Sequence, residues 1–422
     1  MRSLHFTSNI VPNSRAARLG YFLLLLMLAA LPAACGQGDT AEPAPAGSTA
    51  TSAVSPAELD ADVRAVATTY ADIVYATYAD TLADATALQT AVDTFVAAPS
   101  EETLAAAKQA WLAARESYGQ SEAFRFYGGP IDDADGPEGL LNAWPLDEAY
   151  IDYVEGAPDA GIINNVADYP EITQDLLISL NEVGAEENIS TGYHAIEFLL
   201  WGQDLRADGS GERPYTDYVE GGAAANPVRR GQYLTVVADL LVQQLSGLVA
   251  AWDPAGTDTY RAEFLALPTD DVLQKMLTGI GVLSKSELAG ERIFTAYDNQ
   301  DQEDEHSCFS DNTHRDIIAN AQGIANVYLG RYVRPDGSVV EGAGLRDIVA
   351  AVDPDLNAEL VAMLDSTLAH AQAIHVPFDQ AIVRPDTRPA VLETVYALQD
   401  QGDKFAQVAH ELGVAIDTAL PE

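Results

Sequence analysis

The chain has 422 residues and is strongly acidic: 64 Asp and Glu against 22 Lys and Arg give a formal net charge of -42 at pH 7. A surface of this sign repels nucleic acid and anionic lipid headgroups, which excludes nucleic acid as a partner. Because acidic residues are so common here, an acid-rich segment does not by itself indicate a ligand cluster.

The N-terminal segment is typical of an exported bacterial lipoprotein. Arg15 and Arg18 precede an apolar run over residues 21–34, which is shorter than the roughly 20 residues of a membrane-spanning helix and fits a secretory signal. The run ends in a lipobox-like sequence whose Cys35 would carry the lipid, although Pro32 stands where Leu is usual. Ordinary signal cleavage nearby is the alternative. Because glycine and not aspartate follows the cysteine, we expect an outer-membrane anchor facing the periplasm.

After the signal peptide of residues 1–35, the sequence predicts a tether and two domains. Residues 36–56 are rich in Ala, Pro, Gly, Ser and Thr and lack an apolar period, so we expect a flexible tether. Helical-bundle domains are expected over residues 57–225 and 226–422. Their order of helices and loops suggests a loose internal duplication.

Helical periodicity dominates the sequence after the tether. In the first long segment Val63, Val66, Tyr70 and Ile73 recur at steps of three and four residues. Ser100 is a candidate N-cap for the next helix. Loops are expected at 128–144 and 204–227 because Gly, Pro and Asp are frequent there. No segment favours a series of strands, so the predicted fold is all-α. Helices are expected at 60–98, from the Ser100 cap through 111–118, and at 146–155, 174–183, 192–202, 229–251, 270–294, 314–328, 354–375, 388–398 and 404–418.

The helix predicted at 192–202 carries a Gly-x-His-x-x-Glu sequence. His194 and Glu197 lie three residues apart and therefore project from one helix face. An imidazole nitrogen and a carboxylate oxygen at this spacing can hold one transition-metal ion between them. A lone His-x-x-Glu is a weak signal, and a hydrogen-bonded structural histidine is the alternative.

Several separated sequence blocks make the motif more specific. Gly-x-His-x-x-Glu is the signature of the imelysin family, and the chain resembles this family, above all its iron-regulated lipoproteins, over most of its length. The blocks that carry the resemblance are residues 121–132, 192–197, 286–292, 301–314 and 376–382. The resemblance implies two helical bundles packed side by side with the functional site between them.

Further ligands must come from other blocks. Glu122 is the first candidate, and a structural pair with Arg125 one helical turn away is the alternative. Glu291 and Arg292 are two charges on an otherwise apolar helix, which suggests burial, either in an interdomain ion pair or, for Glu291, as a metal ligand.

The block at 301–314 adds His306, Asp311 and His314 as candidates for a second set of ligands. Alternatively, Asp311 caps the helix that begins near His314, and His306 orders the loop through backbone carbonyls. Cys308 has no partner once Cys35 is acylated, so we interpret it as a small buried residue.

The resemblance implies a cell-envelope lipoprotein that binds iron or another transition cation, with components of iron uptake as partners. Imidazole and carboxylate ligands also suit zinc and copper. The first alternative is a metal-dependent peptidase, the activity for which the family is named, but the His-Glu-x-x-His sequence of many zinc peptidases does not occur here. The second alternative is a metal-free module for ligand binding or adhesion.

Overall fold

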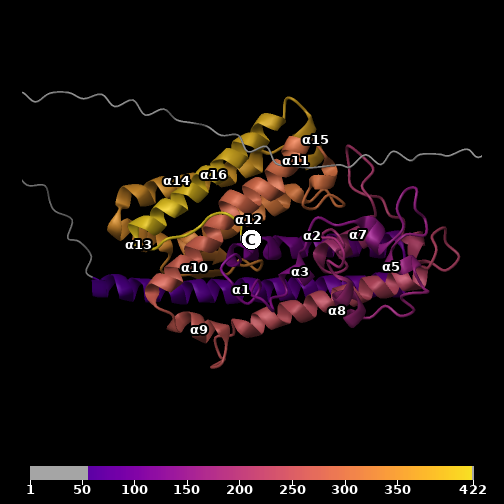
Figure 1. Cartoon of the computed structure of the whole chain (residues 1–422), viewed down its shortest axis with the longest axis horizontal. Coiled ribbons are helices and arrows are strands. Elements are labelled where there is room, and N and C mark those ends of the chain that lie inside the picture. The colour runs from indigo at the N-terminus through magenta and orange to yellow at the C-terminus, as the bar shows by residue number, and fades with distance from the viewer. Residues whose placement is uncertain (1–55, 421–422) are drawn as a thin grey trace, which may run out of the picture. The chain divides into compact units, whose positions relative to one another are not determined.

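A computed structural model of the chain describes residues 56–420. The predicted signal peptide, Cys35 and nearly all of the predicted tether lie outside these residues. The described part is helical, with one small hairpin (Figure 1), which confirms the predicted all-α class. Residues 56–251 contain α1 (Pro56–Ala97), α2 (Glu101–Ser121), the 3-10 turn η1 (Glu122–Phe124), α3 (Glu138–Leu141), α4 (Glu148–Ile151), α5 (Gly161–Asn164), α6 (Gln174–Leu180), α7 (Gly192–Trp201), the 3-10 turn η2 (Tyr215–Tyr218) and α8 (Pro227–Ala251).

The remaining elements follow α8 in the chain. They are α9 (Tyr260–Ala266), α10 (Thr269–Val282), the π-helical segment η3 (Leu283–Phe294), α11 (Thr295–Asn299), the 3-10 turn η4 (Gln302–Asp304), α12 (Thr313–Leu329), β1 (Arg331–Val333), β2 (Val339–Glu341), α13 (Leu345–Val352), α14 (Pro354–Ala373), α15 (Phe378–Val383) and α16 (Arg388–Glu411).

The turn between the first two long helices is built as predicted. The Ser100 hydroxyl accepts a hydrogen bond from the Thr103 amide at 3.2 Å, and the Thr103 hydroxyl accepts one from the Ser100 amide at 3.0 Å. This reciprocal capping box pairs backbone donors that the helix start would otherwise leave free. The chain therefore reverses at Ser100, and α2 returns along α1.

The longest helix, α1, packs along both α2 and α8 (Figure 1). In the second half, α12, α14, α16 and η3 pack against one another, and α12 also packs against α2. The described residues form one compact unit. The predicted division at residue 225 and the internal duplication stay predictions. Helix α8 is long and apolar enough to cross a membrane by length and composition alone, but here it lies against α1 and α7.

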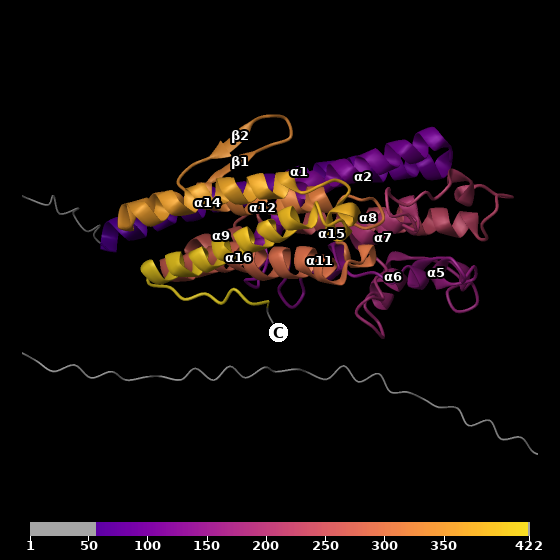
Figure 2. The ribbon, with the colours of Figure 1, turned by 90° about the horizontal axis from the view of Figure 1, so that it is seen from above.

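The small hairpin was not predicted. β1 and β2 pair antiparallel, with Tyr332 opposite Val340, and project beyond the helices (Figure 2). Each strand has only three residues, which is too short to show an alternating pattern. The buried Tyr332 hydroxyl donates to Asp80 of α1 at 2.9 Å, so the hairpin is attached to the first helix.

The prediction of two helices at 388–398 and 404–418 was wrong, since α16 runs unbroken to Glu411. Gly402 lies inside this helix, where its role is close packing. A Cβ atom at this position would lie 2.5 Å from the Lys285 Cβ atom of η3. The glycine therefore lets two helical segments approach each other without interrupting either.

The helix predicted at 270–294 changes its winding halfway. α10 gives way to the π-helical segment η3, in which residues five apart rather than four apart share a face. Arg292 donates through Nε to Glu287 Oε1 at 2.9 Å across this interval. The π segment thus turns Arg292 into the interior, where it is 2% exposed, with an acidic partner from its own face.

Candidate functional site

The motif helix α7 lies entirely within the core, because all ten of its residues are buried. Gly192 begins the helix with a φ of 84°, a conformation that disfavours side chains. A Cβ atom there would also lie 2.5 Å from the Leu141 carbonyl oxygen of α3. The glycine of the motif is therefore required by backbone geometry, and it brings α7 against α3.

His194 and Glu197 form a buried hydrogen-bonded pair, with Nδ1 of the imidazole 2.9 Å from Oε2 of the carboxyl group. The other oxygen, Oε1, accepts from the amide and hydroxyl of Ser310 at 2.9 and 2.6 Å. Burial raises the pKa of Glu197 to about 8, even though Ser310 lowers it. Burial and the nearby His306 and Arg115 hold the pKa of His194 well below its ordinary value, so the imidazole is neutral.

His306 supplies a second imidazole next to the first. The two rings lie 4.8 Å apart between centroids at an angle of 75°. His306 Nδ1 lies 2.8 Å from Asp316 Oδ2, and Asp316 also accepts from the Ser307 hydroxyl and from Arg115 Nε. Burial and the charge of Arg292 lower the pKa of His306 to about 4. The second imidazole is therefore also neutral at physiological pH.

Both histidines have a carboxyl group at Nδ1, but they differ at Nε2. Burial opposes ionisation of Asp316, but the Arg115 guanidinium and the bonds from His306 and Ser307 hold its pKa well below the usual range. His306 therefore donates its Nδ1 proton to Asp316 and keeps a lone pair on Nε2, which lies 3.4 Å from Asn142 Nδ2. Nε2 of His194 has no hydrogen-bond partner among the described residues, although it is buried. Asp316 thus orients His306 as carboxylates orient metal-binding histidines, whereas Glu197, with its raised pKa, does the same for His194 only after losing its proton.

Asn142 connects this pair to Glu122. Its Oδ1 accepts from Arg115 Nη1 at 2.5 Å, and its Nδ2 lies 3.4 Å from both His306 Nε2 and Glu122 Oε1. Glu122 Oε2 accepts from Arg125 at 2.7 Å and from Arg292 at 2.6 Å. Burial opposes ionisation of Glu122, but the two guanidinium groups lower its pKa. Glu122 is thus an ion-paired carboxylate behind the imidazoles.

The other predicted residues lie elsewhere. Glu291 is exposed, so the expectation that it is buried beside Arg292 was wrong; η3 turns it outward. His314 is half-buried, and its Nδ1 lies 3.1 Å from the Asp311 carbonyl oxygen. Asp311 itself has a φ of 56° and a buried oxygen, Oδ1, without a partner. Within residues 59–420, no three His, Cys, Asp or Glu side chains meet closely enough to hold a metal ion as they stand.

Sequence reasoning missed Arg115, Asn142, Ser310 and Asp316. Arg115 and Asp316 are 201 residues apart, so no local spacing links them. Asp316 also looks like an ordinary acidic residue in the first turn of a helix. Arg115 gave a weak signal, because it lies between aromatic residues on a buried helix face and packs over the rings of Trp111, Tyr118 and Tyr193.

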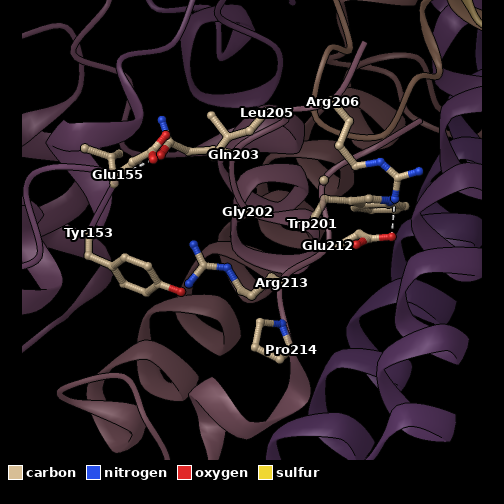
Figure 3. A pocket seen from close by; sticks show the side chains of 12 residues that line it. Tyr153, Glu155, Trp201, Gly202, Gln203, Leu205, Arg206, Glu212, Arg213 and Pro214 are labelled. Carbon is tan, nitrogen blue, oxygen red and sulfur yellow. Dashed lines mark hydrogen bonds and ion pairs between the residues drawn. The ribbon is translucent and has the colours of Figure 1, made fainter. Parts of the chain in front are cut away.

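A polar cavity of about 220 Å³ reaches the imidazole pair from the His306 side. Its inner wall contains Asn142, His306 and Arg292, and its outer wall carries the glutamates Glu138, Glu182, Glu186 and Glu287. A second cavity, of about 360 Å³, lies beyond the C-terminal end of α7 (Figure 3). Trp201, Tyr153 and Arg213 line the second cavity, whereas His194 and Glu197 are not part of its lining. The glutamate-lined cavity therefore reaches the candidate site at His306, while His194 and Glu197 lie behind it and line neither cavity.

Comparison with known proteins places this arrangement in a family. The model of the imelysin family (Peptidase M75) matches residues 74–405. Iron-regulated protein A of Synechococcus elongatus is 28% identical over 340 residues, which cover 78% of this chain and 81% of the relative.

Solved structures share the fold. A crystal structure described as an iron-regulated protein A precursor from Parabacteroides distasonis superposes with a TM-score of 0.64 at 22% identity, covering 83% of this chain and 95% of that one. An imelysin-like protein from Psychrobacter arcticum gives a TM-score of 0.61 at 13% identity, with coverages of 84% and 97%.

Proposed function

Because this chain belongs to the imelysin family, we propose that it binds a transition cation, iron foremost, through His194 and His306. The observation that carries this proposal is the pair of buried neutral imidazoles, of which His194 has a partnerless Nε2. A buried polar atom without a partner costs about 1–3 kcal/mol, so such atoms persist where a ligand uses them.

The residues present fit a cation that brings part of its own coordination shell. Two imidazole nitrogens suit iron, zinc and copper alike. Since no third His, Cys, Asp or Glu donor converges with them in the described residues, water or the oxygens of a chelating carrier would fill the remaining positions. The name of the Synechococcus relative, iron-regulated protein A, favours iron as the cargo.

In this proposal Glu197 and Asp316 act through the histidines. Each carboxyl group holds Nδ1 and thereby directs Nε2 toward the ion. Direct coordination by Glu197, which the spacing predicted, would require breaking its bonds to His194 and Ser310. Glu122 keeps its ion pairs with Arg125 and Arg292 and does not coordinate the ion in this proposal.

The glutamates at the mouth of the small cavity supply an entrance for cations. Glu182 and Glu186 are exposed there, and burial of Glu182 together with the charge of Glu186 raises the Glu182 pKa. A concentration of negative charge around a narrow opening raises the local concentration of cations. Farther in, Glu287 and Glu138 pair with Arg292 and Arg125, so the negative field is strongest at the rim.

We further propose that the protein is held at the outer membrane by a lipid on Cys35, faces the periplasm, and delivers its ion to iron-uptake components. Cys35 lies outside the described residues, and the support is the lipobox-like sequence around it. Replacing Cys35 by Ser should move the protein from the membrane fraction to the soluble fraction. Unchanged fractionation would remove the anchor from the proposal.

Calorimetric titration of the full chain with ferrous, ferric, zinc and cupric ions tests the binding site. We expect one saturable isotherm that the double substitution His194→Ala with His306→Ala removes, while the helical circular dichroism is kept. His410→Ala is the matched control, because His410 is exposed on α16, and it should leave the isotherm unchanged. An unaltered isotherm in the double variant would refute the assignment.

A further inference from the structure

The carboxyl group of Glu305 is buried without a basic partner among the described residues. The residue is 1% exposed, and neither oxygen accepts a hydrogen bond of ordinary geometry, although the Thr313 side chain lies near enough to lower its pKa. Its backbone is fixed, because Trp144 Nε1 donates to its carbonyl oxygen at 2.9 Å. Burial raises the pKa of Glu305 well above the usual range, and the Thr313 side chain offsets only part of this rise.

The surroundings of Glu305 are acidic. Asp379 of α15 is 4% exposed with a partnerless Oδ2, and Asp311 has a partnerless Oδ1. Asp204, which follows α7, is 3% exposed. Asp204 and Asp379 line one cavity, and the charges of Asp379, Asp311 and Asp204 add to burial in raising the pKa of Glu305, so the four carboxyl groups lie near one another. We call this set the acidic cluster.

No basic side chain among the described residues neutralises the acidic cluster. The charge of Arg206 lowers the pKa of Asp311 and of Asp204 in part. However, Arg206 is exposed and already forms ion pairs with Glu212 and Asp208. Within the acidic cluster, His375 lowers the pKa of Asp379 only. Several carboxyl groups removed from water without a counter-charge are costly for the fold. A bound cation would supply the counter-charge that this cluster lacks among the described residues.

A cavity leads from outside to two members of the acidic cluster, Asp204 and Asp379. It has a volume of about 350 Å³ and is lined by Asp204, Asp379, Asp301 and Glu303, together with Gln302. Gln302 donates to the Asp204 carbonyl oxygen at 2.7 Å, which joins the loop after α7 to the loop that carries Glu305. An ion entering here would meet carboxylate oxygens from three separate segments.

We propose that Glu305, Asp311, Asp379 and Asp204 form a second, oxygen-only cation site, suited to a hard divalent ion of the calcium class. Carboxylate oxygens are the preferred ligands of such ions, and calcium tolerates irregular geometry. The carboxyl groups do not converge to a coordination shell as they stand; a divalent ion would displace the protons that their raised pKa values retain, and its charge would draw the ionised groups together.

The site has a structural consequence for the imidazole pair. Glu305 directly precedes His306, and Ser310, which donates to Glu197, precedes Asp311. A cation that ties this loop to α15 and to the segment after α7 would hold His306 and Ser310 in place. The second site is therefore independent of the proposed transition-cation site in its ligands but supports its geometry.

Terbium luminescence tests the site directly. Tb³⁺ replaces Ca²⁺ on oxygen ligands, and its emission rises when a nearby tryptophan is excited; Trp144 touches the Glu305 backbone. With the chelator-treated full chain, we expect saturable sensitised emission that excess Ca²⁺ reduces at least 5-fold. Absence of a saturable phase that Ca²⁺ displaces would overturn the proposal without recourse to any variant.

Substitutions show which residues bind the Tb³⁺ ion that gives the emission. Glu305→Gln with Asp379→Asn should weaken Tb³⁺ binding at least 10-fold, and Trp144→Phe should lower the sensitised emission several-fold while calorimetric Ca²⁺ binding persists. Asp258→Asn with Glu411→Gln changes the charge equally at exposed positions and should have no effect. His194→Ala with His306→Ala should keep the Ca²⁺-displaceable signal, which separates this site from the proposed transition-cation site. Equal emission curves for wild type and the Glu305/Asp379 variant would overturn the assignment.

Discussion

Asp152 and Glu305 are both fully buried carboxyl groups, but their surroundings are opposite. Asp152 accepts from Arg213 Nη1 at 2.7 Å and from Arg230 Nε and Nη2 at 2.6 and 2.9 Å. Glu305 accepts no hydrogen bond from the described residues and faces Asp379, Asp311 and Asp204.

The pKa values follow this difference. Burial would raise the pKa of Asp152, but the charges of Arg213 and Arg230 hold it below the ordinary value, whereas the pKa of Glu305 is raised. A buried carboxylate needs a counter-charge. Asp152 finds its counter-charge within the chain and therefore belongs to the scaffold, while Glu305 lacks one within the described residues and is free to use an ion.

The largest effect is expected at Asp152, the buried carboxylate that has arginine partners. Replacing Asp152 by Ala leaves the buried Arg230 without a carboxylate and Arg213 with only its longer pair to Asp217 at 3.5 Å, and should lower the free energy of unfolding by about 3–5 kcal/mol. Urea unfolding followed by circular dichroism measures this loss. A loss no greater than that of Asp258→Ala, an exposed control, would contradict the structural role of Asp152.

The same variant has an expected dependence on pH. An acid whose pKa is lowered in the folded state stabilises the fold above its unfolded pKa of about 3.9, and this contribution disappears as the pH falls. The difference between wild type and Asp152→Ala should therefore be constant near neutral pH and shrink toward pH 3. If the difference instead grew as the pH fell, the pKa of Asp152 would not be lowered in the folded state.

An added Ca²⁺ ion should stabilise the fold through the acidic cluster around Glu305. If Ca²⁺ binds the folded chain alone, a concentration 100 times its dissociation constant should raise the free energy of unfolding by about 2.7 kcal/mol. Urea unfolding with Ca²⁺ and with a chelator measures the difference. Glu305→Gln with Asp379→Asn should abolish the gain and Asp152→Asn should keep it; a gain retained in the first variant would place the ion elsewhere.

Much of the fold could be predicted from the sequence because helices carry a local period. The steps of Val63, Val66 and Tyr70 continue through α1 as expected, and Gly192 and Gly202 bracket α7. The hairpin and the four-residue helices α3 and α5 escaped because three or four residues are too few to show a period, whereas α4 lies within the helix predicted at 146–155. The single helix α16 was predicted as two, although Gly402 inside it serves a close contact and not a helix end.

The candidate site could be predicted only in part, because its contacts are long-range. The spacing of His194 and Glu197 predicted their contact on α7, and the block at 301–314 contributed His306. His306 meets Asp316 because the loop between them folds back, which the spacing of the two residues does not predict. Asn142 comes from a segment 164 residues away. Their hydrogen bonds depend on how α12 and α3 meet α7.

Of the acidic cluster, the sequence offered only Asp311 as a candidate ligand. The loop from Asp301 to Asp311 contains many acidic residues in a chain that is acidic throughout, and Glu305 cannot be told apart from Asp304 by sequence. Burial separates them, because Glu305 is 1% exposed whereas Asp304 is not buried. The excess of acids thus concealed the one carboxyl group in this loop that lacks water and a partner alike.

The smallest effect concerns Glu305 itself and has the opposite sign to that of Asp152. In chelator-treated protein, Glu305→Gln replaces an unpaired acid by a neutral side chain of equal size, so the free energy of unfolding should stay equal or rise by up to about 1 kcal/mol. Asp152→Asn should lower it, and exposed Asp298→Asn should leave it unchanged. Chemical unfolding of the three variants side by side gives the signs. If Glu305→Gln lost as much stability as Asp152→Asn, Glu305 would have a partner that its surroundings do not show, and the reason for assigning it an ion would disappear.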